Sequence, residues 1–320
     1  MSPPTAPPTI SPRLEVGDIL RRHGADFLQR HALAPRQRQV VHALAACRTA
    51  ALGGHLEVCG RCGQSRPCYN SCRDRHCPKC QTRRRRQWLE ARRAVLPDVG
   101  YFHVVFTLPR PIADLALPNA GGTDAVRRLI YRQLFASAWA AVAGAAPNAL
   151  GAGLPTPPQS GMIAVLHTWG QKLQHHPHLH CLIPAGAWDA EAGVWRDSGR
   201  DFFVPPRQLA DRFRDHFLKH LRRQLQKLNQ PDSPLAAPDS PLATQRWVVY
   251  VKPPIAAGDR GRDVLLGYLA RYTYRAAFSN NRLVDSDDEN HTVTFRYKDY
   301  RRGGRWRRLT LPTHEFIGRF

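Results

Sequence analysis

The stretch HTWGQKLQHHPHLHCLIPAG at residues 167–186 decides the fold. Its second half, HLHCLIPA at 178–185, is a short apolar run that follows closely on MIAVLHTW at 162–169. Two such runs, bounded by Gly and Pro, predict neighbouring β-strands. Because side chains alternate between the faces of a strand, His178 and His180 are expected to point to the same face.

This histidine pair is a candidate metal site. Two imidazoles on one face supply half of a ligand set, although His-x-His by itself also fits solvent-facing histidines on a half-buried strand. His167, His175 and His176 crowd the same segment. Buried neutral histidines need partners, so several together favour a metal or phosphate site.

Working outward, the sequence alternates helical and extended patterns without repeated βαβ units. This order favours the α+β class with an antiparallel sheet. Two short helices broken near Pro35 are expected within 14–50. Further helices are expected at 82–95, 124–143, 206–228 and 262–277, and further strands at 101–108, 246–251, near 291–297 and near 305–311.

The segment GYLARYTYRAAFSNNRL at 267–283 contains candidate nucleophiles. On a helix, Tyr268 and Tyr272 lie at i and i+4 and therefore on one face. A tyrosine hydroxyl attacks only when its target is polarised, which a divalent ion does for a phosphate, and Arg271 and Arg275 would hold flanking phosphates. Spacing alone favours the alternative that Leu265, Leu269 and Tyr272 form an apolar stripe that packs on the sheet.

Eight cysteines are present, and six of them fall within 59–80. Cys59-x-x-Cys62 and Cys77-x-x-Cys80 are two knuckles that supply four thiolates, the set that tetrahedral zinc prefers. Further donor residues lie between and before the pairs: His55, Cys68, Cys72 and His76. They could form a second metal site or replace a ligand in the first. Because the chain has CxxC spacing and no export signal, we expect these cysteines to bind metal and not to form disulfides. The expected location is the cytoplasm, in association with the nucleoid.

The charge of the chain indicates an anionic partner. Lys and Arg number 47 against 25 Asp and Glu, a net charge of +22 over 320 residues. The basic residues cluster in 55–97 and 296–308, which fits nucleic acid better than a small-molecule substrate. Beside the second knuckle, Trp88 follows four arginines expected to contact DNA: Arg83, Arg84, Arg85 and Arg86. No apolar run is long enough for a transmembrane helix, so no membrane role is expected.

These patterns divide the chain into three parts. The Pro-rich residues 1–12 are expected to be a disordered tail. Residues 13–98 form a helical and zinc-binding DNA-binding domain, and 99–320 form the catalytic domain with a Pro/Ser linker at 231–242. A helix just begins after Thr313, so a missing C-terminal part is expected.

Four stretches in order resemble the HUH-type, two-tyrosine transposases of rolling-circle insertion sequences. They are SCRDRHCPKCQ (71–81), YFHVVFTLP (101–109), HTWGQKLQHHPHLHCLIPAG (167–186) and YLARYTYRAAFSNNRL (268–283). The resemblance implies an antiparallel-sheet HUH endonuclease core behind a small zinc module. It implies Mg²⁺ or Mn²⁺ at His178 and His180, and Tyr268 and Tyr272 as the nucleophiles.

The resemblance also implies cleavage and joining of single-stranded or hairpin DNA at element ends, through a 5′-phosphotyrosine link that leaves a free 3′-hydroxyl. A third ligand of the catalytic metal is not evident, and His103 or Gln171 is the candidate. The zinc ligands are expected among Cys59, Cys62, Cys72, Cys77, Cys80 and His76.

Three other functions fit parts of the pattern. A rolling-circle replication initiator or relaxase would use the same histidine pair and tyrosine. A zinc hydrolase would need a carboxylate base, yet none lies between Gly161 and Trp188. A non-catalytic zinc protein that binds DNA, a decayed transposase, would show salt-dependent binding without nicking.

Overall fold

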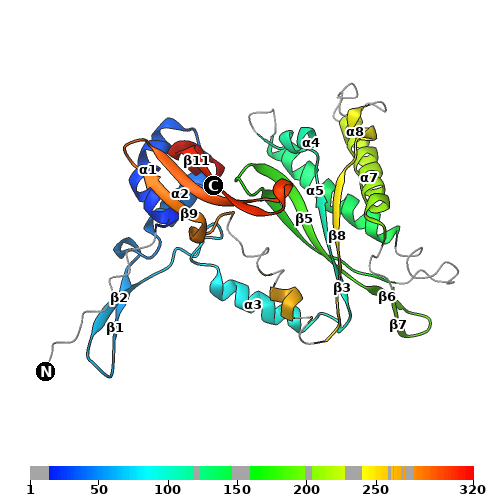
Figure 1. The fold of residues 1–320 in the computed structure, drawn as a ribbon, viewed down its shortest axis with the longest axis horizontal. Coiled ribbons are helices and arrows are strands. Elements are labelled where there is room, and N and C mark those ends of the chain that lie inside the picture. The colour runs from blue at the N-terminus through cyan, green and yellow to red at the C-terminus, as the bar shows by residue number, and fades with distance from the viewer. Residues whose placement is uncertain are drawn as a thin grey trace. The chain divides into compact units, whose positions relative to one another are not determined.

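The computed structural model describes residues 14–117, 123–145, 159–198, 204–227, 240–258, 261, 263–267, 270 and 277–320. The chain forms two compact units, each assembled from segments that are distant in the sequence (Figure 1). Unit 1 holds the described residues within 1–86, 171–174 and 274–320, and unit 2 holds those within 87–170 and 175–273. The division into domains 13–98 and 99–320 follows the chain instead and stays a prediction.

Unit 2 is built on a four-stranded antiparallel sheet in the order β4-β5-β3-β8. The strands are β3 (Tyr101–Thr107), β4 (Ile163–Trp169), β5 (His175–Pro184) and β8 (Val248–Ile255). The helices α5 (Asp124–Ala143) and α7 (Pro206–Lys227) pack on it. Shorter elements complete the unit: α4 (Arg110–Asp114), β6 (Gly186–Asp189), β7 (Val194–Asp197) and α8 (Pro241–Thr244).

The two faces of this sheet differ in what they bury. Phe102, Val104 and Phe106 of β3 share one core with apolar residues of α5 and α7, among them Leu134 and Phe213. The alternation of the strands sends His103, His178 and His180 to the opposite face, because Val105 pairs with His180 and Thr107 pairs with His178. The helices thus cover one face, and the histidines occupy the other.

Unit 1 packs two N-terminal helices against a C-terminal sheet. Here α1 (Val16–Arg30) and α2 (Pro35–Ala46) adjoin the sheet β11-β10-β9 and α10 (Thr313–Arg319). The strands are β9 (Leu283–Asp287), β10 (Thr292–Asp299) and β11 (Arg305–Pro312). The rings of Phe278, Phe295 and Phe316 form its centre, with centroids 5.3 to 5.8 Å apart. The remaining elements are η1 (Ala50–Leu52), β1 (Gly54–Val58), β2 (Ser65–Tyr69), η3 (Asn280–Arg282) and η4 (Tyr300–Arg302).

The turn between β4 and β5 belongs to unit 1. Leu173 of this turn is buried in the same core as Phe278. Arg282, which lies 4.8 Å from the centre of the Phe278 ring, donates to the Gln171 carbonyl, and Arg319 Nη1 donates to the Lys172 carbonyl at 3.2 Å. Backbone carbonyls of the turn are therefore held by two arginines from the end of the chain.

The structure confirms the α+β class and most predicted elements. Pro35 begins α2, which explains the break between the first two helices, since proline is tolerated only in a helix's first turn. The strand β9 and the hairpins β1–β2 and β6–β7 were not predicted. The tail 1–12 and most of the linker 231–242 and helix 262–277 lie outside the described residues. Among the described helices, none is long and apolar enough to cross a bilayer.

Candidate metal centres

Three histidines meet on the face of the unit 2 sheet that lies opposite α5 and α7. His167 of β4 pairs with His178 of β5, and His180 follows two residues later on the same face. One ring nitrogen from each of the three lies within 4.8 Å of the others. His167 and His180 are buried, and His178 is half-buried. Three converging imidazoles on a rigid sheet form a ligand set for one divalent ion.

Hydrogen bonds behind the rings orient two of these imidazoles. His178 Nδ1 lies 2.7 Å from the His176 carbonyl, which can only accept, so this nitrogen carries the proton and Nε2 has the lone pair. His180 Nδ1 lies 3.1 Å from His103 Nε2. Metal-binding histidines characteristically engage their second nitrogen in this way, which fixes the ring and its tautomer.

The candidate third ligands therefore differ from the predicted ones. The structure groups His167 with the pair, whereas His103 lies behind His180 as its hydrogen-bond partner. Gln171 lies in unit 1, where its backbone carbonyl accepts from Arg282. His167 was noted in the sequence only as one of several crowding histidines. The register of β4 against β5 is the signal that could have singled it out.

Burial favours the neutral form of His178 and of three histidines near it. It lowers the pKa of His178 to about 3. Burial, together with the charge of Lys252, lowers the pKa of His103 to about 4. The pKa values of His175 and His176 are also lowered by burial. A histidine binds a metal ion through a neutral ring, so His178 is in its ligating form at neutral pH.

Metal binding at the histidines is expected to persist in mildly acidic solution. A proton competes with the metal only near the pKa, and that of His178 lies far below the ordinary 6.5. Between about pH 7 and pH 5, we expect the Kd for Mn²⁺, measured by electron paramagnetic resonance, to change by less than about threefold. Weakening by about tenfold per pH unit below 6.5 would contradict this expectation.

The lowered pKa of His178 also makes the stability of the folded protein depend on pH. The unfolded chain takes up protons below about pH 6.5 and the folded chain does not, so stability falls as the pH drops from there toward the folded pKa. Circular dichroism at each pH checks that the metal titration is measured on folded protein.

The predicted nucleophiles Tyr268 and Tyr272 lie outside the described residues, as do Arg271 and Arg275. The residues just before Tyr268 are placed, however. Leu265 and Leu266 are buried in a cluster with Tyr101 and Leu182. Leu182 lies two residues beyond His180 and therefore on the same face of β5. The chain that leads into Tyr268 thus packs on the histidine face of the sheet.

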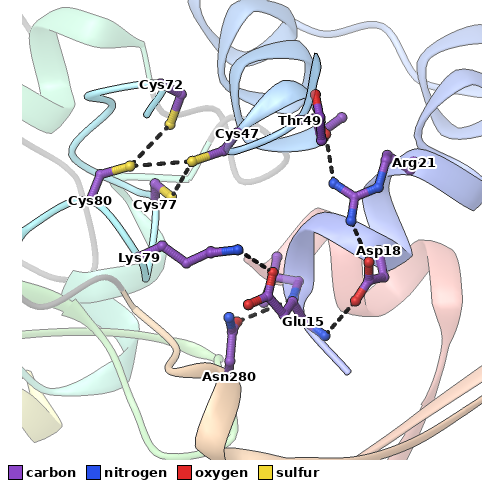
Figure 2. A network of polar contacts seen from close by, with 12 residues as sticks. Glu15, Asp18, Arg21, Cys47, Thr49, Cys72, Cys77, Lys79, Cys80 and Asn280 are labelled. Atoms are coloured by element: carbon purple, nitrogen blue, oxygen red, sulfur yellow. Dashed lines mark hydrogen bonds and ion pairs between the residues drawn. The ribbon is translucent and has the colours of Figure 1, made fainter. Parts of the chain in front are cut away.

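A second candidate centre lies in unit 1, where four cysteine sulfurs converge (Figure 2). Cys47 Sγ lies 3.3 Å from Cys80 Sγ and 3.5 Å from Cys77 Sγ, and Cys72 Sγ lies 3.7 Å from Cys80 Sγ. A zinc–sulfur bond of about 2.3 Å places sulfurs of a tetrahedral site about 3.8 Å apart, so the group fits zinc closely.

The protonation of these thiols also fits a cation. Burial raises the pKa of Cys72 to about 12 and raises that of Cys77 further. Burial acts in the same direction on Cys80, but hydrogen bonds led by that from Cys47 lower its pKa to about 7. Two buried and two half-buried thiols cannot all ionise beside one another without compensation, which a bound dication would supply.

The structure brings together three of the six predicted zinc ligands, Cys72, Cys77 and Cys80, and adds Cys47 to them. Cys47 caps the end of α2 and joins Cys72, Cys77 and Cys80. The predicted ligands Cys59 and Cys62 are exposed beyond the end of β1, outside this group. His76 Nδ1 contacts Asp74 Oδ1 at 3.0 Å instead. A separate exposed group consists of His55, Glu57 and Cys68, where Glu57 is paired with Arg66 at 2.7 Å.

The arginines expected to contact DNA lie on α3 (Thr82–Arg93), none of whose residues is buried. Arg83, Arg84 and Arg86 are exposed, and Arg85 is half-buried. Trp88 packs partly against the cluster of Leu265 and Leu266. The helix therefore presents cations to solvent, whereas its tryptophan contributes to packing.

Comparison with known proteins identifies the family. The family model described as "Putative transposase" matches residues 161–320, and the model "Transposase zinc-binding domain" matches residues 19–108. "Putative transposase y4qJ" of Sinorhizobium fredii (strain NBRC 101917 / NGR234) is 45% identical over 320 residues, covering 96% of this chain and 75% of the relative. No solved structure matches the chain.

A more distant relative gives the same class. "Transposase for insertion sequence element IS801" of Pseudomonas savastanoi pv. phaseolicola is 28% identical over 287 residues, which are 87% of this chain and 64% of that relative. The class is thus that of the insertion-sequence transposases. Within this class the chain belongs to the IS91-like family, the family that its four motifs indicate.

Proposed function

We propose that the chain cleaves and joins single-stranded DNA at the ends of its insertion sequence, by rolling-circle transposition through a 5′-phosphotyrosine intermediate. The observation that carries this proposal is the group of His167, His178 and His180 on one sheet face. Family membership favours this reading over a replication initiator. The element ends, single-stranded or hairpin, are part of the proposal.

The histidine group is proposed to hold one Mn²⁺ or Mg²⁺. Three imidazoles favour Mn²⁺, because nitrogen ligands suit transition ions better than Mg²⁺, which prefers oxygen. The chemistry that such an ion would supply is polarisation of the scissile phosphate, by drawing charge from its oxygens. His103 and the His176 carbonyl keep the rings of His180 and His178 oriented for this ligation.

The covalent step is proposed for Tyr268 or Tyr272. The phenol oxygen forms a bond to phosphorus as it loses its proton, and the P–O3′ bond breaks as the 3′ oxygen gains one. The phosphodiester energy is retained in the tyrosine ester, which a 3′-hydroxyl then attacks to join strands without ATP. The packing of Leu265 and Leu266 on the histidine face supports this assignment.

Trapping the intermediate tests the proposal. Single-stranded oligonucleotides from the ends of the encoding element, labelled 3′ of the cut, are incubated with protein and Mn²⁺ and then run on a denaturing gel. We expect a protease-sensitive labelled product whose peptide maps to Tyr268 or Tyr272. Tyr268→Phe with Tyr272→Phe should abolish it, and Tyr69→Phe, an exposed tyrosine of β2, should not. Cleavage that survives the double change would refute the mechanism.

A zinc hydrolase is the second candidate, since three histidines also form the ligand set of some catalytic zinc sites. Such an enzyme activates water with a nearby base and needs no tyrosine. No carboxylate belongs to the histidine group among the described residues. Phosphodiester hydrolysis that is unaffected by both tyrosine changes would favour this candidate.

A further inference from the structure

The outer face of the unit 1 sheet carries a cationic and aromatic surface. Directly opposite residues of β10 and β11 point to one face, and the pairs are Thr294 with Thr310, Arg296 with Arg308 and Lys298 with Trp306. The alternate residues Val293, Phe295 and Tyr297 are buried in the core. We call the outer six residues the platform.

The centre of the platform is Trp306. Its side chain is 55% exposed, unlike the buried Trp247 of unit 2. Lys298 Nζ lies 5.4 Å and the Arg296 guanidinium carbon lies 5.7 Å from the centre of the Trp306 ring. An exposed indole between two cations offers a flat apolar surface with phosphate-binding groups at its edge.

Among the described residues, no acid of the sheet forms an ion pair with the cations of the platform, and Asp285 of β9, opposite Thr294, is the acid that lies nearest on the same face. Arg296 lies opposite Arg308, and like charges directly opposite destabilise a strand pair. Within the described residues, no ion pair joins a carboxylate to Arg296, Lys298 or Arg308, whereas Asp299 pairs with Arg307 of the other face at 3.4 Å. Arg296 is fixed by a 3.0 Å hydrogen bond to the Asn281 carbonyl. An anion bound here would relieve the repulsion.

We propose that the platform binds single-stranded DNA, with a base stacked on Trp306 and phosphates at Arg296, Lys298 and Arg308. A paired base presents only its edge to a protein, so an exposed ring on a sheet favours an unpaired strand. The inference rests on the proposed function in taking that strand to be element DNA. It adds a contact region, in unit 1, that neither the histidines nor the arginines of α3 supply.

The test measures binding without cleavage. Fluorescence anisotropy of a labelled deoxythymidine oligonucleotide is recorded for the full chain without Mn²⁺ or Mg²⁺, beside a duplex of the same length. Trp306→Ala should weaken binding to the single strand by between about 5- and 150-fold, the range for one stacked base. Trp306→Phe, which keeps a ring, should lose much less. Thermal unfolding should be unchanged, since Trp306 is exposed.

The phosphate contacts of the platform are tested with a second pair of variants. Arg308→Gln should lower the slope of log affinity against log salt by about 0.7, the value for one phosphate on a single strand. Arg305→Gln removes the same charge from the opposite face of β11 and should leave the slope nearly unchanged. Equal effects of the two changes would overturn the proposal.

Three further outcomes would overturn it. If Trp306→Ala binds the oligonucleotide as tightly as the parent protein does, no base stacks on Trp306. If Trp306→Ala weakens single-strand and duplex binding equally, the platform is a general anion site and has no preference for an unpaired strand. A ribo-oligonucleotide that binds the platform more tightly than DNA would also count against it. Because no arm measures cleavage, failure of the platform and failure of the tyrosine mechanism are separate results.

Discussion

Replacing His167 with alanine is expected to lower Mn²⁺-dependent DNA cleavage by at least about 100-fold. The two remaining imidazoles would hold the ion only weakly, and the transition state would lose the several kcal/mol of charge stabilisation that a bound ion supplies. His167 pairs with His178 across β4 and β5, so its removal deletes a ligand without disturbing the strand that carries the other two. Single-turnover cleavage of an end oligonucleotide at a fixed Mn²⁺ concentration measures the effect.

Two other histidines provide controls. His176→Ala keeps the backbone carbonyl that orients His178 and should cleave within about threefold of the parent. His103→Ala should weaken Mn²⁺ binding by about 10- to 100-fold, as loss of an orienting partner does, and excess Mn²⁺ should restore its rate. If His103→Ala were beyond rescue while His167→Ala cleaved normally, the third ligand would be His103, as the sequence suggested.

Replacing Cys47 with serine is expected to remove the bound zinc and destabilise unit 1. Cys47 joins the helical N-terminal segment to the loop that carries Cys72, Cys77 and Cys80, so one lost thiolate disconnects two parts of the unit. Structural zinc contributes much of the folding free energy of small zinc modules. We expect a loss of at least about 3 kcal/mol and a Tm lower by roughly 10 °C. Zinc analysis by mass spectrometry and calorimetry measure the two effects.

The matched control is Cys59→Ser. Cys59 is exposed and lies outside the four-sulfur group, so its replacement should leave the zinc bound by that group in place. The opposite pattern, with zinc lost on changing Cys59 and retained on changing Cys47, would restore the pairing of two CxxC knuckles that the spacing predicted. The comparison therefore decides between the local pattern and the folded geometry.

The predictable features are those encoded within one segment. His178 and His180 fall on one face because they are two residues apart on a strand, and Pro35 begins a helix wherever the chain goes next. The fold class followed from the order of such segments. These rules need no knowledge of which strands pair.

The features that the sequence did not predict depend on long-range pairing. His103 meets His180 only because β3 lies beside β5 in the sheet, and no local pattern fixes that order. Cys47 stands alone in the sequence, so only the packing of α2 near the second knuckle reveals it. The association of residues 277–320 with the N-terminal helices is equally non-local.

The four-sulfur group also links metal content to oxidation. The pKa of Cys80, about 7, makes a large part of this thiol a nucleophilic thiolate at neutral pH, and Cys47 Sγ is its neighbour at 3.3 Å. A zinc-bound thiolate is shielded, whereas a chelator in air exposes the pair to oxidants. Each disulfide formed would consume two of the four ligands. Zinc added afterwards would then rebind only once a reductant had reopened the bridge.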